Sequence, residues 1–248
     1  MYSENIDKLK RALKTESPEL IVRNFKNHLN NEPPVTEAII SHESTDNQPV
    51  IIPSNTNPNK KNILFVSPNL PDFDESAGGK RAWYMLKLLQ EEYQVYAYTR
   101  GQKPAHHRAK LENDGIIIID THNFENVKRS IPQFDTIIFG WYYTMNECSY
   151  ILKYYPESTI IMDTVDIHWV REKRSLGNWD GIDENKWKEN KAKELDVYKR
   201  ADKIWVVSQT DADAIHAEID GADIAIVSII EDIKKDIYSC DLEKQECR

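Results

Sequence analysis

The sequence predicts a doubly wound α/β fold around a mostly parallel sheet, and three observations carry that prediction. Apolar segments of strand length alternate with helical segments from residue 61 to residue 230. Several strand segments are continuous apolar runs, such as the four isoleucines at 116–119, which are typical of strands buried on both faces. The spacing leaves room for a helix between most successive strands, as a parallel sheet requires. Together these features indicate a Rossmann-like sheet.

The individual elements follow from apolar patterning and from turn residues. The expected strands are Ile63–Ser67, Gln94–Thr99, Ile116–Asp120, Thr136–Gly140, Thr159–Asp163, Ile204–Ser208 and Ile224–Ser228. The expected helices are Gly79–Glu92, Pro104–Asn113, Glu125–Ser130, Asn146–Tyr154, Glu184–Ala201 and Gln209–Glu218. Ligands of such sheets bind outside the carboxyl ends of the strands, so the segments after the strands are where a functional site is expected.

The chain divides into four parts by composition. Residues 1–30 are expected to form a helical appendage of two short amphipathic helices, which docks either on the main domain or on a partner. Residues 31–60 are rich in Pro, Asn and Ser and are expected to form a linker. Residues 61–230 hold the sheet, and residues 231–248 form a polar tail.

Composition excludes several function classes. The formal net charge of −9 argues against nucleic acid or an anionic membrane as a partner. The three cysteines are scattered and lack metal-ligand spacing, so the sequence predicts neither a disulfide framework nor a metal site. No apolar run approaches the 18 residues of a transmembrane helix, and the N-terminus lacks the apolar core of a secretory signal. A cytoplasmic protein without a transmembrane segment is expected.

Gly78 and Gly79 stand where the first strand passes through a polar loop into a helix. Such a turn is either a cradle for a phosphate or sugar, since glycine allows close approach to the backbone, or a plain turn before a helix. The pattern matches neither a P-loop nor G-x-G-x-x-G, and the next strand ends in Thr-Arg instead of an acid, which argues against a dinucleotide-dependent dehydrogenase. Lys80 and Arg81 follow in the first helical turn, where a cation opposes the helix dipole. Either an anionic ligand nearby explains these charges, or both side chains simply face solvent.

The run from Asp163 to His168, Asp-Thr-Val-Asp-Ile-His, follows a buried strand at the expected ligand edge. Polar side chains there are costly unless they are used or paired. His168 is either a group that bonds a sugar hydroxyl or relays a proton, or a structural residue beside acids that cap the next helix. The aromatic run 141–143 after the fourth strand either stacks on a sugar ring or packs in the core. Ser208 is expected to cap the helix that contains Asp211.

Three segments together resemble the N-terminal domain of GT-B glycosyltransferases of family 4. They are ILFVSPNLPDFDESAGGKRAWYMLKLLQ at 63–90, IIMDTVDIHWVREKR at 160–174 and ELDVYKRADKIWVVSQTDADAI at 194–215. The resemblance covers residues 62–230. It implies a retaining transfer from a nucleotide-sugar to a glycan acceptor, as in polysaccharide biosynthesis, without a metal or another cofactor.

The resemblance also implies roles for individual residues. It places Gly78 and Gly79 beside the diphosphate and sugar of the donor, and Asp163 belongs to the same donor and sugar site. His168 would contact a hydroxyl of the transferring sugar, and Asp166 would orient that region, so both are the expected catalytic residues. Arg81 and Arg171 become candidates for contacts with an anion or the acceptor.

The second Rossmann domain of this family, which carries the nucleotide pocket, is not found within these 248 residues. A donor-domain partner protein is therefore expected if the chain takes part in transfer, because one half cannot hold donor and acceptor in line. A non-catalytic carbohydrate-binding or regulatory remnant of such an enzyme is the alternative. An unrelated Rossmann-like binding protein, with the loop at 78–79 covered by residues 1–60, is a third.

Overall fold

The computed structural model describes residues 59–119, 124, 131–176 and 182–228 of the chain. Four predictions fall largely on other residues: the helical appendage at 1–30, the linker at 31–60, the helix at 125–130 and the polar tail at 231–248. They lie outside the described residues, apart from the last two residues of the linker.

The described part of the chain forms one seven-stranded sheet in the order β3-β2-β1-β4-β5-β6-β7, and every strand pair in it is parallel. The strands are β1 (Asn62–Ser67), β2 (Gln94–Thr99), β3 (Ile117–Ile119), β4 (Thr136–Gly140), β5 (Thr159–Asp163), β6 (Lys203–Val206) and β7 (Ile224–Ile226). The Rossmann-like α/β fold predicted from the sequence is confirmed. Each predicted strand is present, with ends that differ by two residues or fewer.

The helices are α3 (Ala77–Glu92), α4 (Ala105–Asn113), α5 (Tyr142–Cys148), α6 (His168–Ser175), α7 (Glu184–Arg200), α8 (Gln209–His216) and the 3₁₀ helix η2 (Ser149–Tyr154). The predicted helix at 146–154 is in fact α5 followed by η2. The short helix α6 was not predicted, since the sequence after β5 was interpreted as a ligand-binding loop. Side chains of Ser76, Asp183 and Ser208 cap α3, α7 and α8, and the capping role expected for Ser208 is confirmed.

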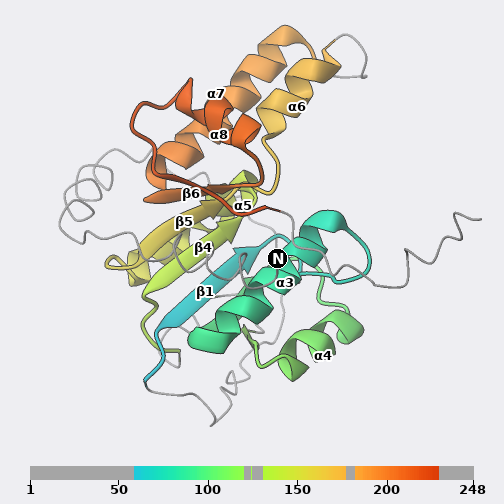
Figure 1. The fold of residues 1–248 in the computed structure, drawn as a ribbon, viewed down its shortest axis with the longest axis vertical. Coiled ribbons are helices and arrows are strands. Elements are labelled where there is room, and N and C mark those ends of the chain that lie inside the picture. Colours follow the sequence, from blue (N-terminus) through green and yellow to red (C-terminus); the bar gives the residue numbers. More distant parts are fainter. Residues whose placement is uncertain (1–58, 120–123, 125–130, 177–181, 229–248) are drawn as a thin grey trace, which may run out of the picture.

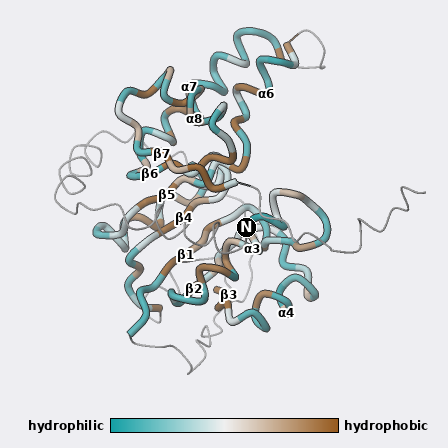
Figure 2. The backbone as a smooth tube through the Cα atoms, in the orientation of Figure 1, coloured by the Kyte–Doolittle hydropathy of each residue, from teal (hydrophilic) through white to brown (hydrophobic). Residues whose placement is uncertain are grey.

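Alternate residues of each strand face two separate cores, as strands buried on both faces require. In β1, Leu64 and Val66 belong to one core, whereas Ile63 and Phe65 belong to the other. The second core is completed by α3 and α4, and the first by α5, η2, α7 and α8. Hydrophobic residues accordingly gather in the strands, while the outer ends of α6 and α7 are mainly hydrophilic (Figure 2).

Helices therefore cover both faces of the sheet, and the chain changes face between β3 and β4. Strand β1 lies between β2 and β4, so the strand order reverses at the β1/β4 junction. Helix α3 contacts β2, whereas α6 and α7 lie side by side at the far end of the sheet, beyond β6 (Figure 1). A reversal of this kind is where open α/β sheets bind their ligands. None of the helices within the described ranges has the length and apolar character needed to cross a bilayer.

Candidate functional site

The segments that follow β1, β4 and β5 meet at Gly78. A Cβ atom added there would lie 3.0 Å from Val165 Cγ1 and 3.2 Å from Trp141 Cζ2. Gly78 lies in the first turn of α3 after β1, Trp141 follows β4, and Val165 follows β5. All three residues are half-buried. The glycine turn and the run from Asp163 to His168 thus lie together at the edge where the strand order reverses.

Two of these contacting residues have an unusual backbone. Val165 has a φ of 57° and Trp141 a φ of 65°. A positive φ is a clear outlier for a β-branched or bulky residue, and such strain is concentrated at functional sites. The backbone N–H of Asp166 donates to the Thr164 carbonyl at 2.5 Å, across Val165. A hydrogen bond over two residues with positive φ at the central one is the pattern of the rare, strained form of γ-turn.

Asp72 lies in the loop that leads into α3. Its carboxylate accepts hydrogen bonds from the backbone N–H groups of Glu75 and Ser76, at 3.0 and 2.6 Å, and from the Ser76 hydroxyl. The Ser76 hydroxyl in turn accepts from the N–H of Gly79 at 2.9 Å. A Cβ atom at Gly79 would lie 2.0 Å from Asp72 Oδ2, so glycine is needed there for the chain's own carboxylate. These hydrogen bonds occupy the backbone N–H groups of Glu75, Ser76 and Gly79, which are therefore not free to bind an anionic ligand.

Arg81 and Asp163 form a fully buried ion pair. Arg81 Nη1 donates to Asp163 Oδ2 at 2.7 Å, and both side chains are 0% exposed. Nε and Nη2 of Arg81 donate to the carbonyl of Val227, just beyond β7, at 3.2 and 2.9 Å. The pair therefore ties α3 to β5 and to the chain after β7. These positions do not support the predicted roles in ligand binding, because neither charged group is exposed to a ligand.

His168 is the first residue of α6, and its side chain is 16% exposed. Its ring meets the rings of Tyr142 and Tyr143 edge to face, at centroid distances of 5.1 and 5.9 Å. Burial, together with the nearby charge of Arg171, lowers the pKa of His168 below its usual range. The imidazole is thus neutral at pH 7, where it can donate or accept a hydrogen bond.

Glu194 holds this histidine in place, and the sequence interpretation missed it. The backbone N–H groups of His168 and Trp169 donate to Oε1 and Oε2 of Glu194, both at 2.9 Å, and the Tyr198 hydroxyl donates to Oε1 at 2.5 Å. His168 Nδ1 lies 3.9 Å from Glu194 Oε1. Burial raises the pKa of Glu194 to about 7, although these hydrogen bonds act in the opposite direction. A Glu on α7, 26 residues from His168, gives no local signal in the sequence.

Asp166 and Arg171 form an ion pair at the surface of the same edge, and both side chains are about half exposed. Asp166 is thus close to His168 in the chain, but its carboxylate pairs with Arg171, a solvent-facing residue of α6. Of the predicted site residues, Gly78, Asp166, His168 and Arg171 remain accessible or partly accessible at one edge. Gly79, Arg81 and Asp163 are buried beneath it.

The segment from Asp163, the last residue of β5, to Trp169 also concentrates buried polar atoms that have no hydrogen-bond partner among the described residues. They are Asp163 Oδ1, Thr164 Oγ1, His168 Nδ1 and Trp169 Nε1. Since nearly all buried polar atoms in folded proteins are paired, four such atoms within seven residues require an explanation. Together with the positive φ of Val165, they make this segment the strongest candidate for a functional site. The described residues that could hold a metal ion form a separate cluster on the β1–α3 loop and α4.

Comparisons with known proteins add little to this geometry. No protein-family model matches the sequence, and no curated protein matches it. Among solved structures, the fold is similar to the glucose dehydrogenase from Haloferax mediterranei, with 12% sequence identity and a TM-score of 0.32. That alignment covers 71% of this chain and 54% of the dehydrogenase, so the chain spans about half the length of that structure. A likeness at this level does not bear on the function.

Proposed function

We propose that the chain is the acceptor-side half of a GT-B glycosyltransferase similar to family 4. In this role it takes part in the retaining transfer of a sugar from a nucleotide-sugar to a glycan acceptor in the cytoplasm. The observation that carries the proposal is that the three segments with the family resemblance interlock at one sheet edge. Gly78 of the first segment contacts Val165 of the second, and Glu194 of the third binds the backbone of His168.

In the proposed reaction His168 contacts a hydroxyl of the transferring sugar. A neutral imidazole suits that role, because its ring nitrogens can both donate to and accept from a hydroxyl. Glu194 fixes the backbone of His168, and Tyr142 and Tyr143 fix its ring. Such support is what a group that orients a reacting sugar needs, since small displacements cost much of the gain from positioning.

The nucleotide itself is held, in this proposal, by a second Rossmann-like domain. Two features of this half favour that division. The loop before α3 holds the carboxylate of Asp72 on the N–H groups of Glu75 and Ser76, which brings a negative charge close to the place where a diphosphate would bind. Arg81, which was predicted to offer a cation at that turn, is instead paired with Asp163. In this proposal the loop at 78–79 therefore packs beside the sugar and offers no positive charge to the phosphates.

The same carboxylate of Asp72 favours a second candidate, a non-catalytic carbohydrate-binding protein descended from such an enzyme. A neutral sugar needs hydrogen-bonding groups and aromatic rings but no anion cradle. His168, the half-buried Tyr142 and Tyr143, and Asp166 supply those groups at one edge. The two candidates differ in whether His168 supports turnover or only binding.

The decisive experiment measures release of nucleoside diphosphate from a panel of UDP- and GDP-sugars. The full chain is assayed alone and mixed with the product of the neighbouring reading frame, while ligand-observed NMR follows sugar binding to the chain. We expect transfer in the mixture and a loss of about 100-fold in His168→Ala, the scale by which misplacement of a reacting group slows an enzyme. His216→Ala, an exposed histidine on α8, is the matched control and should retain full transfer.

Three outcomes separate the candidates. Transfer that depends on His168 supports the glycosyltransferase. Binding of a sugar that is lost in His168→Ala, without transfer in any mixture, supports the non-catalytic binding protein. Neither transfer nor sugar binding would overturn both.

A further inference from the structure

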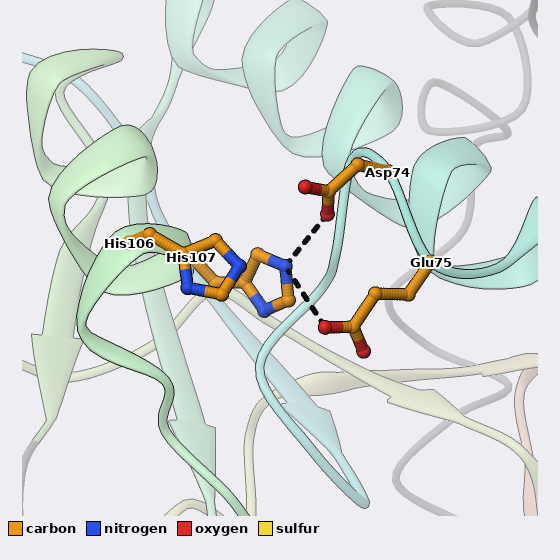
Figure 3. A group of neighbouring side chains, drawn as sticks. All are labelled: Asp74, Glu75, His106 and His107. Carbon is orange, nitrogen blue, oxygen red and sulfur yellow. Dashed lines mark hydrogen bonds and ion pairs between the residues drawn. The ribbon is translucent and has the colours of Figure 1, made fainter.

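A second cluster of polar side chains lies outside the site described above. Asp74 and Glu75 are in the loop between β1 and α3, whereas His106 and His107 are in the first turn of α4 (Figure 3). Each of the four offers one ligand atom, and these atoms all lie within 4.8 Å of one another. Two segments about 30 residues apart in the sequence thus point nitrogen and oxygen atoms at one place.

His107 is the buried member of the cluster. Its side chain is 2% exposed, and Nε2 lies 2.8 Å from Asp74 Oδ1 and 3.8 Å from Glu75 Oε1. The other three side chains are exposed. A buried ring beneath three exposed side chains gives one fixed ligand and three that can adjust their positions.

The two histidines are adjacent in the chain, yet their rings face the same place. Their centroids lie 3.9 Å apart, although neighbouring residues of a helix normally point about 100° apart. Phe73, which precedes Asp74, packs edge-on against both rings, at 6.2 Å from His106 and 5.4 Å from His107. The contact between His107 and Asp74 alone would need neither His106 nor Glu75. All four side chains are explained if they share one cation.

We propose that Asp74, Glu75, His106 and His107 bind a divalent transition-metal ion of the Zn²⁺ type. Two imidazole nitrogens and two carboxylate oxygens suit Zn²⁺ in tetrahedral geometry, whereas Ca²⁺ and Mg²⁺ prefer oxygen ligands alone. Zinc ligands at about 2.0–2.1 Å from the ion lie roughly 3.4 Å from one another, so the exposed side chains need to close in only slightly. The ion would also offset the charges of two neighbouring carboxylates.

This site joins α4 to the loop between β1 and α3. That loop also contains Asp72, which accepts a hydrogen bond from the N–H of Ser76 and lies beside Gly79. A bound ion would therefore fix the loop that leads to Gly78 at the sheet edge. The proposal does not depend on the proposed function, because it rests on the ligand atoms alone.

The test uses the full chain without an affinity tag, stripped with a chelator and titrated with Zn²⁺ by calorimetry. We expect one tight equivalent in the wild type and a rise in Tm as Zn²⁺ is added, because the ion binds only the folded chain. His106→Ala and Glu75→Gln change exposed ligands, so the apo proteins should fold normally. Each should bind the ion at least about tenfold more weakly, and the rise in Tm should shrink accordingly.

His216→Ala is the matched control, because His216 is exposed on α8 and lies outside the cluster. Co²⁺ is the second probe, since sites with thiolate ligands show charge-transfer absorption that sites with only nitrogen and oxygen ligands lack. Equal affinity in the wild type and His106→Ala, or thiolate absorption from the single tight equivalent, would overturn the proposal. His107 and Asp74 would then be a structural contact only.

Discussion

Glu194 Oε1 accepts a hydrogen bond from the backbone N–H of His168 at 2.9 Å, so a side chain of α7 determines where α6 begins. Oε2 does the same for Trp169. A carboxylate is favourable at a helix N-terminus, where the N–H groups and the helix dipole both attract negative charge. At this position it is also 1% exposed, and burial opposes the charge.

The raised pKa of Glu194 predicts how stability depends on pH. Its pKa is about 7 in the folded chain and near its ordinary value of 4.5 when unfolded. Between these values the folded state binds a proton that the unfolded state does not, so this group makes the free energy of unfolding increase as pH falls from 7 to 4.5. Above pH 7 both states are ionised and the burial penalty is present in full. The change is at most about 1.4 kcal/mol per pH unit.

Urea unfolding of the wild type and Glu194→Gln between pH 5 and pH 8 measures this effect. The amide does not titrate, so the wild type should gain stability relative to the variant as pH falls. His168 acts in the opposite direction, since its lowered pKa means that stability is lost as pH falls below about 6.5. The comparison is therefore repeated in a His168→Gln background. A difference that stays constant from pH 5 to pH 8 would contradict the prediction.

Gly79 and Asp72 should show strong energetic coupling. Gly79→Ala forces the Asp72 carboxylate out of its place, because the two would be only 2.0 Å apart. Loss of its hydrogen bonds to Glu75 and Ser76 should reduce the free energy of unfolding by about 1 kcal/mol. In an Asp72→Ala background the same change should be neutral or stabilising by up to about 1 kcal/mol, since alanine favours the helix. A double-mutant cycle by urea unfolding tests this, and additive single effects would disprove the coupling.

The strands could be predicted closely because continuous apolar runs such as 116–119 are visible in the sequence. Helix α6 could not, since only one of its residues, Trp169, is buried and its cap comes from Glu194 on another helix. The buried position of Arg81 could not be predicted for the same reason, because it depends on residues distant in the sequence. Its place in the first turn was correct, but its direction depends on Asp163 and Val227, which are distant in the sequence.

The meeting of Gly78 with Val165 was expected from sheet topology, because the carboxyl ends of all strands of a parallel sheet lie at one edge. The cluster that includes Asp74 and His106 was not expected. Its ligands come from the loop after β1 and from the first turn of α4 after β2, which the pairing of these two strands brings together. Paired acids and paired histidines were its only signal in the sequence, and neither pair has a known ligand spacing.

Val165 should reverse the usual preference for alanine over glycine. In an ordinary helix or strand, glycine is less stable than alanine by about 0.5–1 kcal/mol. At a φ of 57° the Cβ atom is penalised, so Val165→Gly should be more stable than Val165→Ala by about 1 kcal/mol. Both variants lose the contact of Val165 Cγ1 with Gly78, so their difference isolates the backbone term. Thermal unfolding of Val165→Gly and Val165→Ala measures this difference. If Val165→Ala were the more stable variant, the backbone at residue 165 would be unstrained.

The ion pair of Arg81 and Asp163 should behave as a buried structural pair and not as part of a ligand site. Asp163→Ala leaves a guanidinium group buried without its partner, which should cost roughly 3–5 kcal/mol in the free energy of unfolding. Replacing both residues, as Arg81→Met with Asp163→Val, should cost less than the single change, because no uncompensated charge remains. Asp166→Ala is the matched control, since its pair with Arg171 is exposed and should contribute less than about 1 kcal/mol. Equal losses in the free energy of unfolding for Asp163→Ala and Asp166→Ala, measured with urea, would mean that the Arg81 charge is solvated. Arg81 would then again be a candidate ligand-binding residue.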